Sequence, residues 1–66
     1  MSVAKVIEVS ARSPESFEAA IAEGIAKAGD SVHGIREAWV KDMTVQVEDG
    51  RISGYEVELK ITFLVD

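Results

Sequence analysis

The chain has 66 residues, no cysteine, one histidine and a formal net charge of −5. We expect one domain, residues 1–66, whose small core buries only about 60% of the surface that the unfolded chain exposes. Because disulfides and thiolate metal sites are excluded, association with further copies is the remaining way to enlarge that core. The 12 acidic residues outnumber the 7 basic ones, which argues against nucleic acid and anionic membrane surfaces as partners.

No apolar run approaches the roughly 20 residues that span a bilayer. The start of the chain, residues 1–5, lacks the basic region and apolar stretch of a signal peptide. We therefore expect a soluble cytoplasmic protein.

The first half of the chain predicts a strand followed by a helix. Residues 3–10 are rich in Val and Ile, as strands are. Ser13 is the expected helix cap, Pro14 the first helical residue, and Gly29 the expected stop. Between them an apolar stripe recurs at spacings of three and four: Phe17, Ala20, Ile21, Gly24, Ile25 and Ala28.

The second half predicts two strands joined by a tight turn. Residues 35–48 change their apolar phase midway, which predicts a β-bulge near Lys41-Asp42. Asp49-Gly50 predicts a two-residue hairpin turn. The last strand alternates almost ideally from Tyr55 to Val65. The order β-α-β-β predicts an α+β fold in which a three-stranded antiparallel sheet partly wraps one helix.

Residues that carry catalysis are scarce. The chain has no cysteine nucleophile, and its five glycines are scattered singly, so no phosphate-binding loop is present. The single His33 lies in the connection from helix to strand, where a structural or solvated role is the ordinary one. We expect that the protein is not an enzyme.

Trp39 stands out among the candidate binding residues. In a strand, Glu37 and Trp39 project from one face, while Ala38 and Val40 project from the other and suit packing under the helix. Trp39 then points away from the core of the subunit. Two readings stay open: Trp39 fills an interface between subunits, or its indole forms a stacking platform for a planar ligand.

Acidic residues gather on the polar face of the last strand and near it in sequence. Glu56 and Glu58 share that face, and Asp42, Glu48 and Asp49 precede them. Such residues ordinarily form a solvated face. The alternative is a cation site that symmetry-related copies complete, because hard cations require several carboxylate oxygens.

Several runs of the chain resemble the dodecin family. They are VAKVIEV at residues 3–9, SPESF at 13–17, VK at 40–41, EDGRI at 48–52, and YEV and LKITF between residues 55 and 63. The resemblance covers essentially the whole chain in order and length. It implies a hollow homododecamer that binds flavins, of the riboflavin or FMN class, stacked between tryptophans. Such proteins store and quench flavins without redox catalysis.

Two positions depart from the pattern of flavin-binding dodecins. That pattern has Trp-x-Glu-Val, whereas this chain has Glu37-Ala38-Trp39-Val40, so the Trp and the Glu have exchanged places. Where a Gln commonly contacts the flavin, Glu56 stands, an acceptor only when ionised. The expected cofactor-binding residues are Trp39, Glu37 and Glu56. Two functions stay open: a flavin store with an altered site, or a flavin-free shell that binds cations or another small ligand.

Overall fold

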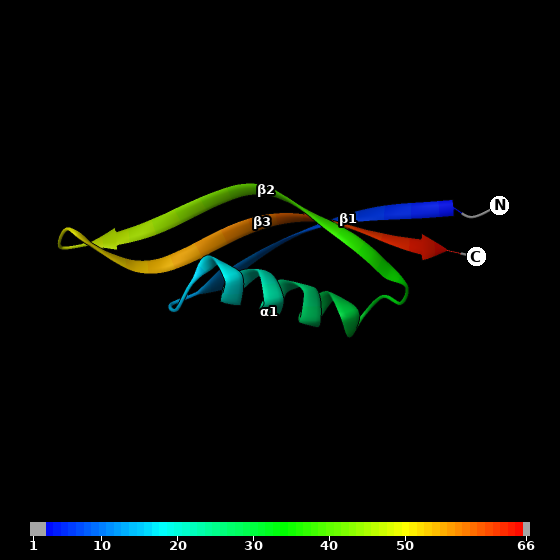
Figure 1. Cartoon of the computed structure of the whole chain (residues 1–66), viewed down its shortest axis with the longest axis horizontal. Helices are drawn as coiled ribbons and strands as arrows, with labels where there is room; N and C mark the ends of the chain where they lie inside the picture. The colour runs from blue at the N-terminus through cyan, green and yellow to red at the C-terminus, as the bar shows by residue number, and fades with distance from the viewer. Residues whose placement is uncertain (1–2, 66) are drawn as a thin grey trace.

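The computed structural model describes residues 3–65 and has the order β1 (Val3–Ser13), α1 (Phe17–Gly29), β2 (Ile35–Glu48) and β3 (Arg51–Val65). The strands form one antiparallel sheet in the order β1-β3-β2, with β3 in the centre. Figure 1 shows this long twisted layer with α1 lying along one of its faces. The predicted α+β class and β-α-β-β order are confirmed. No helix within residues 3–65 is long and apolar enough to cross a membrane.

The predicted start of the helix is wrong by three residues. β1 continues to Ser13, which pairs with Tyr55 instead of capping a helix. Its hydroxyl oxygen accepts from the Glu15 N–H and shapes the turn that contains Pro14. Ser16 is the cap: its backbone is extended and its hydroxyl oxygen accepts from the Ala19 N–H at 3.0 Å. The strand extends because β3 offers pairing partners that far, and a proline favours extended backbone in the residue before it.

The core lies between α1 and one face of β3. Ala20, Ala28, Val57, Leu59 and Ile61 are its buried apolar residues. The helix ends at Gly29, as predicted.

The approach of α1 to the sheet depends on Gly24. A Cβ at this position would lie 2.9 Å from Leu59 Cδ1 and 3.1 Å from Ala11 Cβ. Both distances are shorter than ordinary van der Waals contact, so only a glycine allows the helix to approach this closely.

β2 follows β3 with three register shifts. One lies between Val40 and Asp42 and leaves Lys41 without a pairing partner, which confirms the predicted bulge. The others lie between Ile35 and Glu37 and between Gln46 and Val47, and neither was predicted.

The hairpin turn is the predicted one. Asp49 and Gly50 both have positive φ, 51° and 76°, between the paired residues Glu48 and Arg51. Positive φ at both central residues is what a type I′ turn requires.

Candidate functional site

The face of the sheet that points away from α1, called the open face below, carries most of the charged side chains of the three strands. Residues paired across antiparallel strands share a face, and Val57, Leu59 and Ile61 face the helix. The even-numbered residues of β3 therefore lie on the open face. With their partners on β1 and β2 they form four rows: Arg12-Glu56-Thr44, Ser10-Glu58-Asp42, Glu8-Lys60-Trp39 and Val6-Thr62-Glu37.

Glu37 and Trp39 lie on the open face, as the sequence predicts, and meet in one groove. Ala38 and Val40 pack against the core on the other side. Trp39 keeps 63% of its surface exposed. The groove has a volume of about 510 Å³ and is lined by Val6, Glu37, Ala38, Trp39, Lys60 and Thr62. An exposed indole beside such a groove provides a flat apolar surface for a ring.

A cation already lies on the indole. The Lys60 ammonium is 5.3 Å from the centroid of the Trp39 ring, within the range of a cation–π contact. Glu8, which pairs with Lys60 in the sheet, instead accepts from Lys41 Nζ at 3.3 Å. A side-chain hydrogen bond shared with the Glu58 carboxyl group, together with the one that Lys41 donates, holds the pKa of Glu8 below its usual range.

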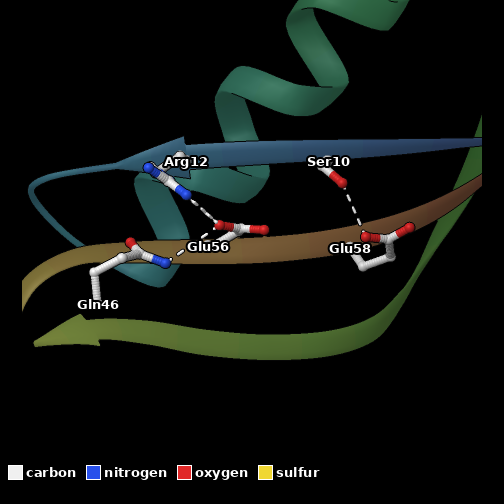
Figure 2. A network of polar contacts seen from close by, with 5 residues as sticks. All are labelled: Ser10, Arg12, Gln46, Glu56 and Glu58. Carbon is white, nitrogen blue, oxygen red and sulfur yellow. Dashed lines mark hydrogen bonds and ion pairs between the residues drawn. The ribbon is translucent and has the colours of Figure 1, made fainter.

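Glu56, the third predicted binding residue, lies outside this groove. It is four residues along β3 from Lys60, or about 13 Å at the usual rise of a strand. Figure 2 shows Arg12 and Gln46 converging on its carboxylate from the two flanking strands. Arg12 Nη2 donates to Glu56 Oε1 at 2.8 Å, and Gln46 Nε2 donates to the same oxygen at 3.2 Å. Glu56 is thus neutralised by an ion pair with Arg12 of the same chain.

The Gln46 amide has a second notable contact. Its carbonyl oxygen is buried and has no hydrogen-bond partner within residues 3–65. A Cβ on Gly54, the residue paired with Gln46, would lie 2.6 Å from this oxygen. Because Gly54 has no side chain, the Gln46 amide has the space to lie across the sheet and donate to Glu56.

Glu58 and Asp42 are direct cross-strand partners on the open face. Like charges in such a pair repel. Ser10 Oγ donates to Glu58 Oε1 at 2.9 Å, as Figure 2 shows, and no basic side chain among residues 3–65 forms an ion pair with either carboxylate. Carboxylate oxygens are suitable ligands for a hard cation such as Ca²⁺. Within residues 3–65, however, no group of three acidic or histidine side chains converges closely enough to hold a metal ion.

Sequence reasoning missed Lys60, Arg12 and Gln46 as partners of the predicted residues. The alternation of the last strand placed Glu56 and Lys60 on one polar face. The neighbours of these two residues depend on the register of β1 and β2, which local sequence does not encode.

These features define a small α+β fold with one sheet, one covering helix and an open face rich in carboxylates. The chain belongs to the dodecin family: the family model described as dodecin matches residues 3–66.

Three comparisons place the chain within this family. It is 40% identical to the calcium dodecin of Mycobacterium tuberculosis (strain ATCC 25618 / H37Rv) over 63 residues, which cover 96% of this chain and 89% of that protein. A solved structure of calcium dodecin from Mycobacterium tuberculosis superposes on this chain with a TM-score of 0.83 at 39% identity. The match covers 98% of this chain and 93% of that one, and that protein is described as a calcium-chelating immunodominant antigen with a novel calcium-binding site. The dodecin from Streptomyces davaonensis superposes with a TM-score of 0.92 at 29% identity, covering 98% of this chain and 96% of that one.

Proposed function

We propose that the protein is a non-catalytic binding protein that assembles with copies of itself and holds divalent cations between carboxylates of its open face. The observation that carries this proposal is its 40% identity to a calcium dodecin over 96% of the chain. The family resemblance sets the expected number of copies at twelve.

Self-assembly is supported by the large apolar surface that one subunit leaves exposed. The Cα trace measures 52 × 19 × 13 Å, so the subunit has little interior. Met43, Val47 and Ile52 are each more than half exposed. Both β1 and β2 are edge strands of the sheet, and natural proteins usually cover such edges. Contacts with further copies would bury these surfaces.

Cation binding is linked to assembly in this proposal. The paired carboxylates of Asp42 and Glu58 supply oxygen ligands, but one subunit brings too few of them together. Copies related by symmetry would add the remaining ligands, and the cation would relieve the repulsion between carboxylates.

The test is a calcium titration of thermal stability. We expect Ca²⁺ at millimolar concentration to raise the Tm of the wild type, while Asp42→Asn reduces that rise. The control is Glu23→Gln, which removes the same charge from the exposed side of α1. A Tm that does not respond to Ca²⁺ would contradict cation binding. Light scattering that reports a folded 7.1 kDa monomer at micromolar concentration would contradict assembly.

The second candidate function is binding of a planar ligand of the flavin type in the Trp39 groove. The exposed indole beside a groove of about 510 Å³ favours it. Here Glu37 and Trp39 form the site, and Glu56 contributes only if the ligand, or a further copy, extends along the sheet.

Fluorescence titration of riboflavin separates the roles of the exchanged residues. If Trp39 is the platform, the wild type quenches riboflavin fluorescence and Trp39→Ala abolishes the quenching. If instead the exchange removed the flavin site, the wild type does not bind, and the double change Glu37→Trp with Trp39→Glu creates binding. Failure of both proteins to bind riboflavin would exclude a flavin function for this strand.

A further inference from the structure

We propose that Lys60 is a specificity-determining residue of the Trp39 groove, which selects planar aromatic ligands that carry an anionic group over neutral ones. This inference rests on the second proposed function, a planar ligand stacked on Trp39. It adds the charge that such a ligand must carry and the residue that recognises that charge.

The bulge in β2 brings a lysine to Glu8 on the open face. The register shift between Val40 and Asp42 leaves Lys41 unpaired in the ladder, and its ammonium reaches Glu8 on the open face at 3.3 Å. Glu8 is the direct cross-strand partner of Lys60, and the charge of Lys60 still helps to lower the pKa of Glu8. The ion pair of Glu8, however, is formed with Lys41 and not with Lys60.

Lys60 lies over the indole and outside any ion pair of the described residues. It forms no ion pair with any residue in the part of the chain from 3 to 65. Its ammonium lies over the Trp39 ring, 5.3 Å from the centroid. A cation–π contact at an exposed site is weak, so an anion can draw the ammonium away from the ring.

Opposite charges lie in two adjacent rows of the groove. Trp39 and Lys60 form one row, and Glu37 and Thr62 form the adjacent row. A neutral ring that stacks on the indole must displace the Lys60 ammonium and offers it no partner in return. A ring with a phosphate or carboxylate displaces the same ammonium but then pairs with it, which is a charge-assisted hydrogen bond. Glu37, in the other row, suits an N–H donor of the ring and repels a second anionic group.

The experiment compares riboflavin with its 5′-phosphate, FMN, which share one ring system and differ in the phosphate. In fluorescence titrations we expect the wild type to bind FMN about tenfold more tightly than riboflavin, as one charge-assisted contact allows. Lys60→Met should reduce this ratio to about threefold or less, and Lys60→Arg should preserve it, since arginine keeps the charge. Added salt should shrink the ratio in the wild type, which a purely structural role of Lys60 would not cause.

The matched control is Lys27→Met, which changes the net charge equally but lies in the last turn of α1, outside the groove. It should leave the FMN-to-riboflavin ratio unchanged. Equal affinities in the wild type, or a ratio that Lys60→Met does not alter, would overturn the role of Lys60 while leaving planar-ligand binding intact. If the wild type binds neither compound, the planar-ligand function itself fails, and this inference fails with it.

Discussion

The packing of α1 on the sheet leads to a prediction in which one substitution has opposite effects in two backgrounds. In the wild type, Gly24→Ala places a methyl group 2.9 Å from Leu59 Cδ1, and Leu59 is fully buried and cannot move aside. The gain in helix propensity is about 1 kcal/mol. Overpacking costs about 1–3 kcal/mol. We therefore expect a net loss of about 0–2 kcal/mol in the free energy of unfolding.

In a Leu59→Ala background the same methyl group has room. Leu59→Ala by itself should cost about 2–5 kcal/mol, because it leaves a cavity under the helix. Adding Gly24→Ala then regains the helix propensity and fills part of the cavity, at about 0.8 kcal/mol per methylene-sized group. Ala11 Cβ, at 3.1 Å, limits this gain in both backgrounds. We expect the second substitution to stabilise the Leu59→Ala protein by about 1 kcal/mol.

Urea unfolding at one fixed protein concentration measures these differences, since the proposed assembly would make stability depend on concentration. Gly29→Ala is the control: a Cβ there meets nothing within 4 Å, so its effect should be the same in both backgrounds. If Gly24→Ala changes stability by the same amount with Leu59 and with Ala at that position, the close contact between helix and sheet is not the reason for the glycine.

Three further predictions concern single residues. Ser16→Ala removes the cap of α1 and should cost about 1 kcal/mol in a urea titration, and an unchanged midpoint would mean that another group caps the helix. Gly50→Ala forces a side chain into the left-handed region and should cost about 1–2 kcal/mol by the same measurement, whereas a neutral effect would argue against the type I′ turn. The lowered pKa of Glu8 means that its stabilising contribution is present above its ordinary value of 4.5 and is lost as the pH falls through the lower pKa of the folded state. Glu8→Gln should therefore weaken the decline of Tm between pH 5 and 3, and identical declines in both proteins would contradict this contribution.

Features that depend on near neighbours in the chain were determined by the sequence itself. The alternation from Tyr55 to Val65 predicted the last strand and its apolar face, because a period of two is a local property of extended backbone. Asp49-Gly50 specified its turn, since both residues tolerate positive φ. The phase change at Lys41-Asp42 revealed the bulge before any partner strand was known. The runs that resemble dodecins identified the family.

Features that depend on the partner strand were decided only by the tertiary structure. Ser13 and Ser16 are both acceptable caps, and the pairing of Ser13 with Tyr55 chose between them by extending β1. Likewise, the local sequence does not predict that Lys60 lies over Trp39. That contact depends on the register of β2 against β3 and on the ion pair between Lys41 and Glu8. The sequence determines the charge of each side chain, but the pairing of distant strands determines which opposite charge lies beside it. On the open face, strand pairing therefore decides which charged side chains have no partner within the chain and are available to a ligand.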